Sequence, residues 1–470
     1  MLVFAALMLC ITLWVSPVQA EFSLPEMGDP SASLLSVTQE QQLGQQLLRE
    51  VRGRLPLHKD PLLNNYLQSL GYRLVSSTPD AHPHFSFVLV DDARINAFAM
   101  PGGIIGVNTG LLLATRNESE LAAVIAHEIA HVTQRHIARM YAGSARIDFI
   151  TGLAILGAIL ASAYDAQLGQ AAMVGGMAAG AQAKLNHSRA SEQEADRLGI
   201  SILVAAGYNP QAMADFFERM QQLAGPGSEQ VPEFLRTHPV SASRISDARQ
   251  RAAQYAGDYR NDSAEFQRAL ARLQALAEPL RTLQHFEREH RLAQADETTR
   301  YGYAIALIQR GRTDEALRVL QTLEAASSWY LYQSLGKAEA WLAAGANREA
   351  LAQLTLLHDL YPGFQPVAQL YASALLNTGE ASRALKILEP LVEQEHPDPA
   401  LLRMHADAQA RLGQMALSHE SMAEYHFYQG QYRQAMQQIE QALKIPGLGP
   451  HLEERIRSKQ SIVARFIRAS

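Results

Sequence analysis

Two histidines and one glutamate stand within five residues of each other, at His127, Glu128 and His131. Residues four apart share one face of a helix, so the two imidazoles can converge on a single metal ion. Glu128 stands beside the first histidine and can hold and deprotonate a water on that ion. The three side chains therefore predict metal-assisted hydrolysis, unless both histidines are simply packed core residues of a buried helix.

The segment that carries these residues is predicted to be a helix. Its spacing is the H-E-x-x-H pattern in which zinc peptidases place two ligands and a general base. Asn117 with Glu120 three residues later is a capping-box arrangement, which predicts that the helix begins about ten residues before the motif. Apolar residues at helical spacing then mark a buried face, namely Leu121, Val124, Ile125, Ile129 and Val132.

A third ligand is predicted in the helical stretch 186–200, NHSRASEQEADRLGI. Zinc bound by two histidines needs one more protein ligand and keeps one position for water. Glu192 and Asp196 are four residues apart, so one turn presents both carboxylates to the same side. We expect Glu192 to be the ligand and Asp196 to accept the other ring N–H of one of the two histidines. Glu194 is the competing candidate, but it points about 160° away from the face of Asp196. The alternative is an ordinary charged helix surface.

Two further candidates follow in a loop segment, His238 before Pro239 and Arg244 six residues later. His238 could stabilise the oxyanion of a tetrahedral intermediate. It could instead occupy the open zinc position and hold the enzyme latent, or have a structural or helix-capping role. Arg244, like Asp196, is expected to support the ligands without binding the metal. His136 lies off the predicted ligand face and is interpreted as structural.

Four segments in this order resemble the zinc peptidase family that includes the CAAX prenyl endopeptidases and the HtpX-type heat-shock proteases. They are NAFAMPGG at 96–103, HEIAH, the pattern S-R-x-x-E-x-x-A-D-x-x-G at 188–199, and THPVSASRI at 237–245. The resemblance covers residues 35 to 255 in rough terms. It implies one zinc ion per chain, bound by His127, His131 and Glu192, with Glu128 as the general base.

The membrane members of that family carry spanning helices beside the site, and this chain has only short apolar stretches there. Residues 149–164 have no charge but fall short of the roughly twenty residues that a spanning helix needs. With the small apolar residues 171–183 they predict a helical hairpin over 149–183. The hairpin could be a packed core element, a peripheral membrane contact or a cover over the active site, and we favour the last two combined. The chain thus resembles a soluble, exported branch of the family.

Export is predicted from residues 1–20, which carry no charge. They are apolar as far as Val15, and small residues at Val18 and Ala20 predict a signal peptide cleaved after Ala20. The usual basic residue near the start is absent, which suggests a start codon placed a few residues late. Cys10 is the single cysteine and is not expected to be lipidated, so the mature chain has no disulfide. An uncleaved membrane anchor is the alternative.

Composition bounds the remaining possibilities. A chain of 470 residues is long enough for two or three domains, and the formal net charge of −6 without a basic face argues against nucleic acid.

Helices are predicted over 37–53 and 60–76, and a strand over 85–90. Pro101 to Gly103 predicts a turn. The strand predicted at 104–107 is either the edge along which a substrate peptide lies extended or an ordinary sheet strand; our mechanism uses the edge.

A repeat of 34 residues begins at about residue 265. Glycines recur at 311, 345, 379 and 413, with alanines five residues after the first three, and GQYRQAM at 430–436 repeats the form. We expect each glycine to end one helix and let the next pack close. The period is that of tetratricopeptide helix pairs, which stack into a solenoid and end here in a polar cap. Tyr332 and Tyr371 are interpreted as packing residues.

The predicted fold is therefore mainly α, with an α+β zincin-like (gluzincin) peptidase domain followed by an α-solenoid of tetratricopeptide repeats. The predicted domains are a signal peptide at 1–20, a zinc metallopeptidase domain at 21–262 and the repeat domain at 263–470.

This arrangement resembles periplasmic quality-control peptidases of Gram-negative bacteria. The resemblance implies an endopeptidase that degrades unfolded, stalled or misassembled outer-membrane proteins and assists their assembly, with the repeats contacting the β-barrel assembly machinery or the substrate. The alternative is a chaperone or assembly scaffold with a latent or structural zinc site. A third reading, a membrane-anchored processing enzyme, requires that residues 1–20 be retained.

Overall fold

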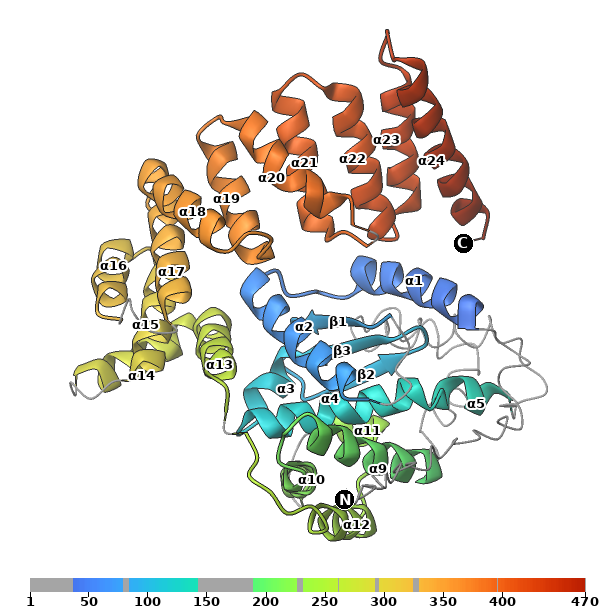
Figure 1. Ribbon diagram of the computed structural model, residues 1–470, viewed down its shortest axis with the longest axis vertical. Coiled ribbons are helices and arrows are strands. Elements are labelled where there is room, and N and C mark those ends of the chain that lie inside the picture. Colours follow the sequence, from blue (N-terminus) through green and yellow to red (C-terminus); the bar gives the residue numbers. More distant parts are fainter. Residues whose placement is uncertain are drawn as a thin grey trace, which may run out of the picture.

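The computed structural model describes residues 37–78, 84–142, 189–225, 231–260, 262–291, 296–323, 329–394 and 396–469. The predicted signal peptide and the apolar hairpin at 149–183 lie outside these residues. Residues 37–260, called here the N-terminal unit, hold a small sheet among helices. Residues 264–469, the repeat array, contain helices and no strand in the part that the structure describes, and they curve around one side of that unit (Figure 1). The predicted class, an α+β part followed by an α-solenoid, is confirmed.

The N-terminal unit opens with two helices that precede its sheet, α1 (Val37–Arg54) and α2 (Pro61–Ser76). Asp60 begins α2 by accepting a hydrogen bond from the Leu63 N–H at 3.0 Å. The strands are β1 (Ser86–Val90), β2 (Ala97–Met100) and β3 (Ile104–Asn108). Their order is β1-β3-β2, with β1 parallel and β2 antiparallel to β3.

This strand order corrects the prediction that the 104–107 strand is the edge for a substrate. β3 pairs on both sides, and all five of its residues are buried. A strand hydrogen-bonded to two neighbours has no free N–H and C=O groups to offer a peptide. The edge nearest the predicted metal residues is β2, which pairs with no strand besides β3 among the described residues.

The remaining helices of the unit surround the sheet and build its core. They are α3 (Thr109–Ala114), α4 (Glu118–Thr133), α5 (His136–Ala142), α9 (Arg189–Ala205), α10 (Gln211–Leu223), α11 (Glu233–Thr237) and α12 (Ala242–Ala252). One apolar cluster joins α2, β1, β3, α4, α9 and α10, with Leu121, Val124, Ile125 and Ile129 of α4 fully buried inside it. The apolar stripe predicted for the motif helix is therefore its core face.

The repeat array consists of antiparallel helices that pack on their neighbours in the chain. They are α13 (Ala264–Ala277), α14 (Pro279–Arg291), α15 (Glu297–Gln309), α16 (Thr313–Gln321), α17 (Tyr330–Ala343), α18 (Asn347–Leu360), α19 (Gln365–Asn377), α20 (Ala381–Val392), α21 (Pro399–Arg411), α22 (Met415–Tyr428), α23 (Tyr432–Leu443) and α24 (Pro450–Ala469). The alanines after the repeat glycines, Ala316, Ala350 and Ala384, are fully buried between helices. Tyr371 is buried in the same core, in agreement with a packing role.

The repeat glycines turn the chain between the two helices of each pair, but for a different reason from the one predicted. Gly345 and Gly379 have φ of 75° and 81°, the left-handed region that a side chain disfavours. A Cβ atom added at either position meets nothing within 4 Å. These glycines are therefore required by backbone conformation at the helix end, and close packing does not explain them.

Contacts at both ends of the repeat array tie it to α1 and α2. Arg272 of α13 bonds Asp60 at 2.7 Å and Glu339 of α17 at 2.7 Å, so its guanidinium joins the start of α2 to two repeat helices. At the other end of the array, the guanidinium of Arg49 in α1 lies 4.8 Å from the ring centroid of Phe427. Figure 1 shows α1 between the sheet and the late repeats. No described helix is long and apolar enough to cross a membrane.

Candidate metal centre

The motif helix α4 begins as the sequence predicts, with one change of partner. The Asn117 side chain accepts a hydrogen bond from the Glu120 N–H at 2.9 Å. Glu120 reaches back to the N–H of Arg116 at 2.8 Å and not to that of Asn117, and it also pairs with Arg219 at 2.6 Å. The start of α4 is thus fixed both to its own preceding turn and to α10, which sets the depth at which the motif is buried.

Helix α9 packs directly along α4, because Gly199 removes the side chain at their closest approach. A Cβ atom at Gly199 meets the Cε atom of Met213 at 2.9 Å and the backbone N of His127 at 3.3 Å. A larger residue would push α9 away from the first histidine of the motif. Gly199 is the last residue of the sequence pattern at 188–199, which also contains the predicted third ligand Glu192. Its packing role is visible only in the structure.

The two helices bring together four side chains that can hold one metal ion, His127, His131, Glu192 and His238. One nitrogen or oxygen atom from each lies within 4.8 Å of the others, and all four residues are buried. The Nε2 atoms of His127 and His131 are 2.9 Å apart, and Glu192 lies 3.6 Å from the first and 3.4 Å from the second. The predicted ligand set is therefore assembled at one point, with His238 added to it.

His238 reaches this point from the end of α11. Its backbone N–H donates to the Phe234 carbonyl at 2.8 Å, and its ring lies on the Phe234 ring with centroids 4.9 Å apart. Its Nδ1 atom lies 3.3 Å from Glu192 and 3.3 Å from the Nε2 atom of His127. Its Nε2 atom lies 3.3 Å from Glu128. His238 thus lies between the general-base candidate and the predicted ligands.

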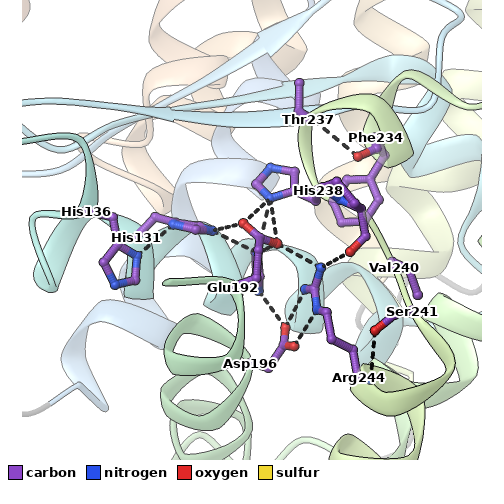
Figure 2. A network of polar contacts seen from close by, with 12 residues as sticks. His131, His136, Glu192, Asp196, Phe234, Thr237, His238, Val240, Ser241 and Arg244 are labelled. Atoms are coloured by element: carbon purple, nitrogen blue, oxygen red, sulfur yellow. Dashed lines mark hydrogen bonds and ion pairs between the residues drawn. The ribbon is translucent and has the colours of Figure 1, made fainter. Parts of the chain in front are cut away.

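Asp196 and Arg244 support the cluster from behind (Figure 2). Asp196 lies 3.0 Å from the Nδ1 atom of His127, the ring nitrogen that faces away from the cluster. The Arg244 guanidinium donates to both oxygens of Asp196, at 2.7 and 2.8 Å, and pairs with Glu192 at 2.8 Å. It also donates to the Pro239 carbonyl at 2.8 Å. One buried cation therefore orients two carboxylates and fixes the loop that carries His238.

His136 and Glu194 lie outside the group of metal-binding candidates, as predicted. The structure adds a contact that the sequence did not indicate, because the Nδ1 atom of His136 lies 2.8 Å from the Nδ1 atom of His131. Glu194 stays out of the cluster, as predicted, and contacts His136 at 3.2 Å and Arg139 at 3.1 Å. His131 is thus contacted from behind, and the helical wheel of a continuous helix could not reveal this.

The charges of the cluster interact strongly without any metal. Burial opposes protonation of His127, but the contacts with Asp196 and Glu192 outweigh it and raise the pKa of His127 to about 9. Burial also opposes ionisation of Glu192, but His238, His127 and His131 hold its pKa well below the ordinary value. The pKa of Glu128 is raised, chiefly because the carboxylate is buried. A metal ion competes with the proton on His127 for the same site.

These residues fit a divalent metal ion. Two imidazoles and a carboxylate are the donors of catalytic zinc sites, and a ligating imidazole needs an acceptor behind it, which Asp196 provides for His127. Both carboxylate oxygens of Glu128 are buried and have no hydrogen-bond partner among the described residues. A buried acceptor without a partner is costly, and a water molecule beside the metal would satisfy it.

The fold and this site define the class of the protein, a metallopeptidase that carries a helical repeat array. The sequence matches Peptidase family M48 over residues 61–252 and a tetratricopeptide repeat over residues 342–412. It is 35% identical over 443 residues to the beta-barrel assembly-enhancing protease of Escherichia coli strain K12, covering 91% of this chain and 88% of the relative. A putative protease of the same name from Vibrio cholerae is 32% identical over 453 residues, 94% of this chain and 93% of that relative.

The mitochondrial metalloendopeptidase OMA1 of Arabidopsis thaliana is 34% identical over 157 residues, 33% of this chain and 29% of the relative. The similarity to it is therefore local, whereas the bacterial relatives match almost from end to end. The chain belongs to the M48 metallopeptidases and, within them, to the group of the beta-barrel assembly-enhancing proteases. The prediction of a metalloendopeptidase is confirmed.

Proposed function

We propose that this chain is a zinc endopeptidase that cuts extended segments of unfolded or stalled outer-membrane proteins. The observation that carries the proposal is the buried Glu128 carboxylate, which has no hydrogen-bond partner among the described residues and faces the cluster. A carboxylate at this position has a chemical use only if a water molecule and a substrate carbonyl come to it.

His127, His131 and Glu192 would hold the metal. Zn²⁺ bound there supplies a Lewis acid for the scissile carbonyl and makes a water molecule acidic enough to lose a proton near neutral pH. Asp196 holds the tautomer of His127 that leaves Nε2 free to bind, and Arg244 holds Asp196 and Glu192 in place.

Glu128 would act as the general base and then as the general acid. Burial raises the pKa of its carboxyl group, which makes the carboxylate a better proton acceptor than an exposed glutamate. It takes the proton of the attacking water and delivers it to the amine that leaves. The backbone N–H of Ala99 lies near enough to lower the pKa of Glu128, so strand β2 runs beside the base.

The substrate would lie along β2. Its outer side pairs with no other described strand, so an extended peptide can add to the sheet there by backbone hydrogen bonds. Recognition through backbone groups depends little on side chains and needs an unfolded segment. This suits a peptidase that acts on proteins that have failed to fold.

His238 would hold the resting enzyme closed. Its ring is near enough to both His127 and Glu192 to complete a four-residue set, and its Nε2 atom approaches Glu128. An oxyanion stabiliser would have to stand clear of the ligands so that a carbonyl could enter between them. The geometry therefore supports the blocking role over the oxyanion role, and cleavage requires that the loop at 238–241 move.

The cellular setting is part of the same proposal. The relatives named for β-barrel assembly come from Gram-negative bacteria, and the uncharged apolar residues 1–20 predict export. We therefore assign the protein to the periplasm, with outer-membrane proteins as substrates. The repeat array would contact those substrates or the β-barrel assembly machinery, since stacked helix pairs present extended surfaces for proteins.

The test compares digestion of casein by the mature chain and by its Glu128→Gln and His238→Ala variants, with zinc content measured on each. We expect slow cleavage by the wild type, faster cleavage by His238→Ala, and none by Glu128→Gln, which still binds zinc. Normal cleavage by Glu128→Gln overturns the assignment of the base. Slower cleavage by His238→Ala, with zinc retained, overturns the blocking role and favours oxyanion stabilisation.

A chaperone or assembly scaffold is the second candidate, and the position of His238 favours it. A metal held by His127, His131, Glu192 and His238 together would resemble a closed structural site. Zinc bound in the wild type with no cleavage by any variant supports this reading.

A further inference from the structure

The two histidines of the motif are supported from behind in different ways. The outward nitrogen of His127 meets a carboxylate directly, at 3.0 Å from Asp196. The outward nitrogen of His131 meets a second imidazole, at 2.8 Å from the Nδ1 atom of His136. Figure 2 shows His136 beside His131, on the side away from Glu192. The two ligands of one motif thus depend on different partners.

A break between two helices brings His136 to this position. On a continuous helix a residue five positions after His131 points about 140° away from it. Helix α4 instead ends at Thr133 and α5 begins at His136. Between them Arg135 has φ of 50°, and within the described residues it is the one non-glycine residue with positive φ. The break returns the His136 ring to within 4.9 Å of the His131 ring, centroid to centroid.

This strained turn is held from outside. The guanidinium of Arg135 donates to Glu40 of α1 at 2.9 Å, and both side chains are only 10% exposed. A non-glycine residue in the left-handed region costs free energy and persists only where neighbouring contacts over-determine it. The contact with α1 is such a restraint, and its position next to a predicted ligand indicates that the turn serves the site.

The hydrogen bonds in this chain of residues allow one consistent arrangement of protons. If His131 offers Nε2 to the metal, its proton is on Nδ1, which donates to the Nδ1 lone pair of His136. The proton of a neutral His136 is then on Nε2, which faces Glu194 at 3.2 Å. Arg139 pairs with the same Glu194 oxygen at 3.1 Å and holds it. Each of the two hydrogen bonds, from His131 to His136 and from His136 to Glu194, then contains one proton, so the donor and the acceptor are assigned in both.

We propose that His136 is a positioning residue for the ligand His131, with Glu194 fixing the tautomer of His136. The proposal rests on the proposed metal site and deepens it. His136 orients the His131 ring and keeps its proton on Nδ1, so that Nε2 is free to bind the metal. The turn at Arg135, anchored by Glu40, sets the distance between the two rings.

The test measures Zn²⁺ affinity by competition with a chelator, and the visible spectrum with Co²⁺ in place of Zn²⁺, on the mature chain and its variants. His136→Leu keeps bulk and removes the acceptor, and we expect Zn²⁺ affinity to fall by about 10–100-fold with a changed Co²⁺ spectrum. His136→Asn places an amide oxygen near the Nδ1 position and should recover most of that loss.

His405 offers a matched control in the repeat array, since it is 9% exposed and its Nδ1 atom lies 3.0 Å from the Ser421 hydroxyl. His405→Leu should lower stability and leave Zn²⁺ affinity and the Co²⁺ spectrum unchanged. Wild-type affinity and spectrum in His136→Leu overturn the proposal. If His136→Leu does not fold, Glu194→Ala decides, because Glu194 is half-exposed; wild-type affinity there overturns the proposal.

Failure of the proposed function is recognised separately. If the wild type and His238→Ala both bind Zn²⁺ but neither cleaves casein, the peptidase proposal is overturned, and the His136 variants still decide the positioning role by affinity. A wild type that binds neither Zn²⁺ nor Co²⁺ overturns both.

Discussion

Two clusters of buried charged side chains among the described residues differ in how completely they are paired. At the junction between α2 and the repeat array, Arg272 bonds Asp60, Glu339 and the Tyr301 hydroxyl, with distances of 2.7 to 3.2 Å. At the metal centre, both oxygens of Glu128 lack a hydrogen-bond partner among the described residues. The charged groups at the junction are all paired within the protein, whereas the oxygens of Glu128 gain a hydrogen-bond partner only when a water molecule or a substrate binds.

This difference predicts that the junction cluster contributes to stability and the metal-centre cluster to the reaction. A buried ion pair with every group satisfied holds two elements in register, and its loss leaves charges without partners. A buried carboxylate whose oxygens accept no hydrogen bond costs stability and is retained for a reaction. Substitutions in the first cluster should therefore lower stability, whereas substitutions in the second should lower activity or metal binding and leave the fold intact.

The largest effect is expected from Glu128→Gln, made in the His238→Ala background so that the site is open. Losing the general base should lower kcat/KM on casein by about 10²–10⁴-fold. The Tm of the chelated protein should stay the same or rise, because burial already disfavours the charge on Glu128. A fall in Tm as large as that of a core substitution would break the comparison.

The next effect is the loss of the junction cation in Arg272→Met. It leaves Asp60 and Glu339 facing each other without their cation, and we expect a loss of about 3–5 kcal/mol in the free energy of unfolding, measured by urea denaturation. Arg281→Met is the matched control, since Arg281 pairs with Glu278 at the surface and is 85% exposed. Equal effects of the two substitutions would show that the junction pair is no different from a surface pair.

The pH dependence of the metal-free protein should distinguish the clusters as well. Asp196 and Glu192 raise the pKa of His127 from 6.5 to about 9, so the stability from this charge is fully present below pH 6.5 and is lost as pH rises through 9. The expected decrease in the free energy of unfolding is roughly 3 kcal/mol across that window. Urea denaturation of the chelated protein at several pH values measures it. Asp196→Asn should flatten the profile, and a flat profile in the wild type contradicts the shift.

The smallest effect is expected in the repeats, at Gly379. Its φ of 81° disfavours a side chain although space is open around it, so Gly379→Ala should cost about 1 kcal/mol in urea denaturation. Gly379→Asn should cost less, because asparagine tolerates the left-handed region. An equal cost for both would point to a packing role for this glycine after all.

The grouping of the candidate metal ligands could largely be predicted from the sequence, because two helices position most of them. Asn117 marks the start of α4, the four-residue spacing puts His127 and His131 on one face, and the same spacing puts Glu192 and Asp196 on another. Helical periodicity is a local property, so it is visible in a short stretch of chain. The spacing does not reveal which histidine Asp196 meets, and this required the packing of α9 on α4.

The features that were missed depend on breaks and on neighbours distant in sequence. Nothing in the residue type of Arg135 indicates a left-handed turn, so the contact of His136 with the outward nitrogen of His131 could not be predicted. The order β1-β3-β2 depends on pairing between strands, so the 104–107 strand was assigned to the wrong place in the sheet. The repeat glycines were recognised by their period, but their φ values supply the reason for them.

The docking of α1 has a consequence for the order in which the protein folds. Arg49 lies over the rings of Phe427 and Phe466, and its Nε atom is 3.4 Å from the Tyr432 hydroxyl, a contact across 383 residues of chain. Contacts this distant in sequence form late, because a long loop must be closed first. The contacts with the last repeats therefore complete the docking of α1, which also packs on the sheet through Leu47, Val51 and Leu55. The same helix carries Glu40, which anchors the turn beside His131, so one helix links the last repeats to the support of the candidate metal centre.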